Sequence, residues 1–137
     1  MVDINTQARI QEVFRRENRS FLQYIRQSSP WAGFAEKAML DKLNQLADEE
    51  LGAVEALALW MESKNISLPY LGAFASKFSS YNFMDVRKLL KPLIAEQKKE
   101  LADLEADAKA LTGEAEKQVA ALVELNRKHL ALLESWA

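Results

Sequence analysis

Five polar side chains fall on helical stripes of this sequence that are otherwise apolar. Glu17, Glu50 and His129 are of types that bind divalent metal ions, and Gln97 and Asn126 are amides. A polar group at a core position needs a partner, so these positions are the informative ones. We predict Glu17, Glu50 and His129 as candidate ligands of a single Fe, Mn or Zn ion, with Gln97 and Asn126 as neighbouring polar residues.

Four helical segments are expected to position these side chains. Apolar residues recur at three- and four-residue steps over 6–29, 35–64, 82–111 and 114–136. A Pro–Gly turn near residues 30–33, a long connection over 65–82 and a Thr–Gly pair at 112–113 separate them. With 4 Gly and 3 Pro, the chain has too few turn-formers for a sandwich or barrel. The pattern predicts an all-α fold, with residues 1–137 as a single four-helix-bundle domain.

The helix boundaries can be predicted from capping residues. Asn5 or Thr6 can cap the first helix. Asn82 can cap the third, with Asp85 as the acidic residue three positions later. Pro92 lies ten residues beyond that cap, so we expect a kink there or a split into two helices.

The connection lengths predict the topology. Short connections favour antiparallel pairs, one from the first two helices and one from the last two. The long middle connection can span the bundle, so the second and third helices are expected to run parallel, in an up-down-down-up bundle with a long crossover. Glu17 and Glu50 lie equally far from the first turn, and Gln97 lies level with Asn126 and His129 across the last one. The polar residues are therefore expected at one level, in the middle of the bundle.

This arrangement resembles the ferritin-like di-iron carboxylate proteins of the bacterioferritin and rubrerythrin type. That family has a Glu on helices 1 and 3 and a Glu-x-x-His motif on helices 2 and 4. The corresponding positions here are Glu17, Glu50, Ala53, Gln97, Asn126 and His129. Three of the six ligand positions match, so the resemblance implies a degenerate di-metal site whose ligands balance the charge of one divalent ion at most.

Several interpretations of these residues stay open. Glu17, Glu50 and His129 could form a metal-free network of ion pairs and hydrogen bonds with the two amides. A different helix phase would bring Glu96 or Glu100 into the place given to Gln97. The resemblance therefore implies a bundle without a complete di-iron site, acting as a non-catalytic structural or interaction protein. The alternatives are a metal-binding or redox protein with one ion, and a remnant pocket that takes a small organic ligand.

Composition bounds the remaining functions. The formal net charge is −2, so no global field favours nucleic acid or anionic lipid. The chain contains no Cys and a single His, which leaves little for nucleophilic catalysis. Enzyme activity stays open, with a non-catalytic role favoured. We expect no cofactor beyond the single ion, no nucleic acid and no membrane, in a cytoplasmic protein. A homodimer or another protein partner stays open. The Arg residues of the first segment, Arg9, Arg16, Arg19 and Arg26, are expected to form a solvated helix face.

Overall fold

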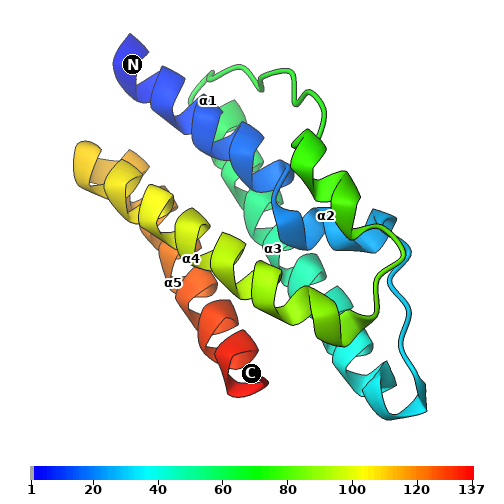
Figure 1. The fold of residues 1–137 in the computed structure, drawn as a ribbon. Coiled ribbons are helices and arrows are strands. Elements are labelled where there is room, and N and C mark those ends of the chain that lie inside the picture. The colour runs from blue at the N-terminus through cyan, green and yellow to red at the C-terminus, as the bar shows by residue number, and fades with distance from the viewer. Residues whose placement is uncertain (1) are drawn as a thin grey trace.

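A computed structural model describes residues 2–137, which are almost entirely helical (Figure 1). The α-helices are α1 (Ile4–Asn18), α2 (Phe21–Gln27), α3 (Lys37–Ser63), α4 (Val86–Ala110) and α5 (Gly113–Ser135), with short 3-10 helices η1 (Phe34–Glu36) and η2 (Ser76–Tyr81). Within the described residues there is no strand, only an isolated bridge between Trp31 and Asp85. The predicted all-α class is confirmed. None of these helices is long and apolar enough to cross a membrane.

The first predicted helix is two helices, so the prediction of one helix over 6–29 was wrong. α1 begins after Asp3, whose side chain accepts a hydrogen bond from the Thr6 amide, and not after Asn5 or Thr6. The helix ends at Asn18, and α2 begins after Ser20, whose hydroxyl accepts from the Gln23 amide at 3.2 Å. Ser20 thus acts as the N-cap that separates the two helices.

The later boundaries differ less from expectation. The N-cap of α4 is Asp85, which accepts from the Arg87 amide, so the cap predicted at Asn82 was three residues early. α4 continues through Pro92 without being split. A proline inside a helix removes only one backbone hydrogen bond, and buried neighbours such as Leu89, Leu90 and Leu93 hold the helix in place.

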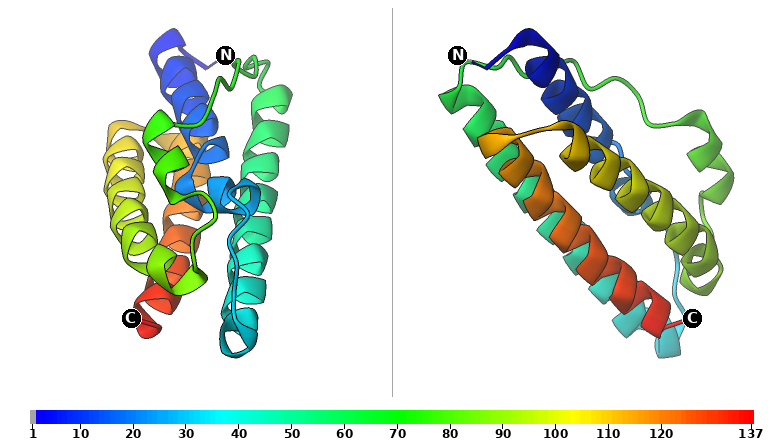
Figure 2. Two further views of the ribbon diagram at one scale, coloured as in Figure 1. Left: turned by 45° about the vertical axis from the view of Figure 1, so that its right-hand side comes forward. Right: turned by 90° about the vertical axis from the view of Figure 1, so that its left-hand side faces the viewer.

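The bundle is elongated, and α1 begins and α5 ends at opposite ends of it (Figure 2). α4 and α5 form the most extensive helix pair, joined by a tight turn at Leu111–Thr112, and Gly113 at the start of α5 adopts a positive φ of 62°. Residues 64–85 pass along the outside of the bundle and contain η2.

Buried apolar residues form two separate clusters, one towards each end of the bundle. The first contains residues such as Phe14, Val54 and Leu104, and the second contains residues such as Phe21, Ala47 and Leu93. Along the chain, a polar residue stands between the two clusters on every long helix. These buried or partly buried polar residues are Glu17, Ser20, Glu50, Gln97, Glu100, Asn126 and His129. A polar layer therefore interrupts the core in the middle of the bundle.

Candidate functional site

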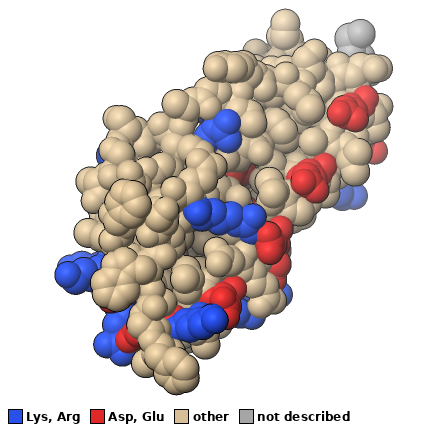
Figure 3. Space-filling view, turned by 90° about the vertical axis from the view of Figure 1, so that its right-hand side faces the viewer, with Lys and Arg blue, Asp and Glu red and all other residues tan. Residues whose placement is uncertain are grey.

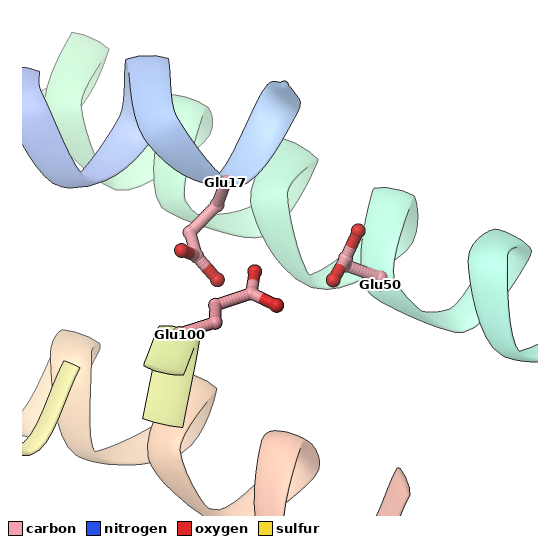
Figure 4. Close-up of side chains that lie close together, drawn as sticks. All are labelled: Glu17, Glu50 and Glu100. Carbon is pink, nitrogen blue, oxygen red and sulfur yellow. The ribbon is translucent and has the colours of Figure 1, made fainter. Parts of the chain in front are cut away.

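Three carboxyl groups from three helices meet in the polar layer. Glu17 of α1, Glu50 of α3 and Glu100 of α4 each offer an oxygen, and these oxygens lie within 4.8 Å of one another. Their side chains point towards one another across the helices (Figure 4). Glu17 and Glu50 are buried; Glu100 is partly exposed as a residue, but its Oε1 atom is buried. We call these three residues the carboxylate cluster.

The break between α1 and α2 helps to position this cluster. The Ser20 hydroxyl donates to Glu50 Oε1 at 2.5 Å, and Gln23 Nε2 donates to the same oxygen at 3.0 Å. Gln23 Nε2 also lies 2.7 Å from the carbonyl oxygen of Ala47, one turn before Glu50 on α3. The N-terminal turn of α2 thereby fixes one oxygen of Glu50.

The environment of the cluster disfavours three negative charges. Burial raises the pKa of Glu17 to about 7, with a further increase from Glu50 and opposing effects from Glu100 and Arg16. Burial also raises the pKa of Glu50 and of Glu100 well above the ordinary value. The Glu100 carboxyl raises the pKa of Glu50 further, and the Glu17 carboxyl raises that of Glu100 further. Like charges at this separation can coexist only with a counter-charge, so the cluster must hold protons or a cation.

Several buried atoms in and beside the cluster have no hydrogen-bond partner. They are Glu17 Oε2, Glu100 Oε1, Asn126 Oδ1, Gln97 Nε2 and Arg16 Nε. Buried polar atoms in native proteins are nearly all paired, so each unpaired one calls for an explanation. Two of the three unpaired acceptors belong to the carboxylate cluster, and the third is on Asn126, whose contact with Glu100 lowers the pKa of that carboxyl. These acceptors fit a metal cation, which binds carboxylate and amide oxygens.

The predicted set of Glu17, Glu50 and His129 is not assembled. His129 is buried, but its Nε2 atom lies 3.2 Å from Glu49 Oε1, and His129 is not part of the carboxylate cluster. Burial lowers the pKa of His129 and Glu49 partly offsets this, which favours a neutral imidazole at pH 7.

Glu100 occupies the place in the cluster that the sequence assigned to Gln97. Gln97 and Asn126 are buried in the polar layer, as expected, but neither supplies a carboxylate. Glu100 follows Gln97 by three residues and therefore lies on the same helix face. This three-residue spacing could have indicated Glu100, which the sequence offered as an alternative to Gln97 for a different helix phase.

A second buried charged group lies beside the cluster and is fully paired by opposite charges. Asp107 accepts from Arg9 Nη1 at 2.9 Å and from Arg16 Nη2 at 2.7 Å. We call these three residues the Arg–Asp network. The expected solvated arginine face is found only in part: Arg9 and Arg26 are exposed, whereas Arg16 and Arg19 are half-buried, and Arg19 donates to the carbonyl of Gly72.

A pocket of about 270 Å³ adjoins the carboxylate cluster. It lies between the end of α1, the start of α2, residues 73–78 and residues 96–103 of α4. Glu100 belongs both to the wall of this pocket and to the cluster. The pocket therefore adjoins the cluster at this carboxyl group.

Comparisons with protein-family models, with curated proteins and with solved structures find no match to this chain. Functional inference therefore rests on the residues of the site.

Proposed function

We propose that this protein is a ferritin-like four-helix bundle that binds one divalent cation at Glu17, Glu50 and Glu100. The observation that carries the proposal is the pair of buried carboxylate oxygens without hydrogen-bond partners, Glu17 Oε2 and Glu100 Oε1, in a group of three carboxyls. A divalent ion would supply both the missing partner and the missing positive charge.

The course of the helices supports the ferritin-like part of the proposal. In Figures 1 and 2, α1 and α5 run towards one end of the bundle, and α3 and α4 run towards the other. With α1 and α2 taken as one broken helix, this course supports the proposed order up-down-down-up, with residues 64–85 as the crossover. The cluster draws one Glu from each of three helices, as the family resemblance implies for carboxylate ligands.

The donor set indicates which ions would bind. Carboxylate oxygens suit hard ions such as Mn²⁺, Mg²⁺ and Ca²⁺, and Fe²⁺ in carboxylate-rich bundles. Zn²⁺ is usually bound with imidazole or thiolate, and His129 is not part of the cluster. We therefore propose Mn²⁺ or Fe²⁺ as the ion, with a binding role and no assigned reaction.

Titration of the metal-free protein with Mn²⁺ at pH 7.5 tests the proposal. The chain is purified without a polyhistidine tag, stripped with a chelator and followed by calorimetry and electron paramagnetic resonance. We expect one ion per chain, with binding weakened by at least about 100-fold in Glu100→Gln. Glu96→Gln is the matched control, because Glu96 lies one turn earlier on α4 and pairs with Lys77. Absence of saturable binding, or equal losses in both variants, would overturn the proposal.

A second candidate function is that of a metal-free interaction protein. Large aromatic side chains are exposed near the first turn and the start of α4: Phe34 is fully exposed, Phe83 is 72% exposed and Trp31 is 59% exposed. Exposed aromatic residues of this kind are enriched in protein interfaces. Metal analysis separates the candidates, because a protein that acts only through this surface would retain no ion after purification from manganese- and iron-supplemented medium.

A further inference from the structure

The pocket beside the carboxylate cluster has a charge opposite to that of the chain. Five Arg and Lys side chains line it, against three Asp and Glu side chains, although the chain carries a net charge of −2. Many of the acidic residues lie elsewhere: Asp41, Asp48, Glu55 and Glu62 are exposed at seven-residue intervals on α3. Figure 3 shows such a row of acidic side chains along one side of the molecule. The pocket thus offers a local excess of positive charge to an anion.

Two buried donors on the pocket wall have no acceptor. Gln97 is 1% exposed, and its Nε2 atom has no hydrogen-bond partner. The Nε atom of Arg16 is also buried and has no hydrogen-bond partner. The nearest carboxylate to Arg16 Nε is Glu17, with its Oε2 atom 3.6 Å away, which is too far for a hydrogen bond. An unpaired buried donor is costly, so both atoms favour an occupant that brings oxygen acceptors.

The other side chains of the pocket indicate the character of that occupant. Arg19 and Lys99 line the pocket, and no ion pair of either with a carboxylate is found within the described residues. Phe21 and Phe78 supply apolar surface, with their ring centroids 4.9 Å apart. A volume of about 270 Å³ is slightly below the range of about 300–1,000 Å³ that is usual for ligand pockets, so the occupant must be small.

We propose that this pocket binds a small organic carboxylate. Its two oxygens accept hydrogen bonds from Gln97 Nε2 and Arg16 Nε, and its apolar part packs against Phe21 and Phe78. Lys99 attracts the anion at the rim. Two unpaired buried donors match the two oxygens of a carboxylate, whereas a phosphate monoester has three terminal oxygens, one more than these two donors can satisfy.

This inference goes beyond the proposed cation site and does not depend on it. The two sites adjoin, since Arg16 Nε lies 3.6 Å from Glu17 Oε2 and Glu100 belongs to both, but their unpaired atoms differ: the donors belong to Gln97 and Arg16, and the acceptors to Glu17 and Glu100. The carboxylate test is therefore carried out in chelator, without Mn²⁺. Failure of carboxylate binding leaves the cation site standing, and failure of cation binding leaves the pocket standing.

Benzoate is the probe, with benzyl alcohol as a neutral control of similar shape and phenyl phosphate as a second anion. Binding is followed by calorimetry and by amide chemical shifts of residues 96–103. We expect one benzoate per chain, bound at least tenfold more tightly than benzyl alcohol and more tightly than phenyl phosphate. Equal binding of benzoate and benzyl alcohol would show that no anion site exists. Tighter binding of phenyl phosphate would overturn the carboxylate class.

Variants locate the site. Gln97→Leu should weaken benzoate binding by about tenfold or more while leaving the melting temperature equal or higher, because it removes a buried amide donor that has no partner. Lys99→Ala should weaken binding about threefold through loss of a rim charge. Lys98→Ala is the matched control: Lys98 precedes Lys99, is exposed, and does not line the pocket. Unchanged affinity in Gln97→Leu would place the ligand elsewhere and overturn the inference.

Discussion

The carboxylate cluster and the Arg–Asp network solve the same physical problem in different ways. Both place charged side chains in the interior, where desolvation is costly. In the network, Asp107 receives two arginines at 2.9 and 2.7 Å. In the cluster, three carboxyls face one another, and the nearest cation is Arg16, 3.6 Å from Glu17 and already bound to Asp107.

The difference shows how a buried acid that only stabilises the fold can be distinguished from buried acids that could bind an ion. A buried acid that is paired by bases needs nothing from outside the chain. The cluster becomes electrically acceptable only when protons or a cation enter, so its stability must depend on pH, and the proposed cation site predicts that it also depends on metal. A residue's burial alone does not distinguish the two cases; its partners do.

Among the single substitutions, removing the central acid of the Arg–Asp network should have the largest effect on stability. Asp107→Ala removes the partner of Arg9 and the shorter of the two ion pairs of Arg16, and we expect a loss of about 2–3 kcal/mol in the free energy of unfolding. This is below the loss of about 3–5 kcal/mol found for fully buried pairs, because the side chains of Arg9 and Arg16 are 44% and 25% exposed. Urea denaturation measures it. Glu105→Ala is the control, since Glu105 forms only an exposed pair with Arg127 at 3.8 Å and should cost less than about 1 kcal/mol. Equal losses would contradict the comparison.

The metal-free protein should lose stability as pH rises from 5 to 7. The raised pKa values mean that the folded protein keeps cluster protons that the unfolded chain releases near pH 4.5. This stabilisation is complete below pH 4.5; the part from Glu17 is lost by about pH 7 and the rest at higher pH. Each such group contributes up to about 1.4 kcal/mol per pH unit.

Urea unfolding at pH 5, 6 and 7 in the presence of chelator measures this slope. His129 acts with the opposite sign, because its pKa is lowered in the fold, so the series is best repeated in His129→Gln. Saturating Mn²⁺ should reverse the slope, since binding displaces the protons. A metal-free stability that rises over this interval in His129→Gln would contradict the proposed state of the cluster.

Replacing one cluster carboxyl by an amide should stabilise the metal-free protein. Glu50→Gln keeps an oxygen for Ser20 and Gln23 and removes an ionisable group beside Glu100. We expect a gain of about 1 kcal/mol at pH 8, together with loss of Mn²⁺ binding. Glu49→Gln, at the adjacent position but outside the cluster, should give neither change. Destabilisation by Glu50→Gln would mean that its charge is already compensated.

The smallest effect is expected at the single histidine. His129→Gln should change Mn²⁺ affinity by less than about threefold, because His129 pairs with Glu49 and not with the cluster. Calorimetric titration of this variant beside the unaltered chain measures the change. A loss of about tenfold or more would restore His129 as a ligand and contradict the three-carboxyl site.

The sequence was sufficient to predict the helices whose boundaries and faces depend on local pattern. The apolar stripe of α3 contains Leu43, Leu46, Val54 and Leu57, and all four are buried. The level of the polar layer followed from distances to the two turns. The break at Ser20 was missed although a local signal was present, because Ser20 and Gln23 have the Ser-x-x-Gln spacing of a capping box. The apolar stripe that continues through this point favoured one helix, and the contact of Ser20 with Glu50 joins positions 30 residues apart.

Glu100 and His129 show why the site was only half predicted. On a helix, a shift of one residue rotates a side chain by about 100°, so pattern can place a residue in the core without choosing the direction in which it points. Glu17 and Glu50 lie on stripes with apolar neighbours before and after them, and both belong to the cluster. His129 has an adjacent acid on α3, Glu49, which the sequence pattern could not distinguish from Glu50 as its partner.

The Ser20 hydroxyl links the angle between α1 and α2 to the packing of these helices against α3, because it donates to Glu50 of α3. A peptide of residues 4–27 on its own keeps the cap from Ser20 to the Gln23 amide but has no Glu50 to accept from the Ser20 hydroxyl, and helices this short are marginal in water. The corner between α1 and α2 is therefore stabilised further when α3 is alongside. The angle between α1 and α2 therefore depends on their packing against α3. A distance measured between spectroscopic probes at residues 10 and 25 during refolding would follow the formation of this packing.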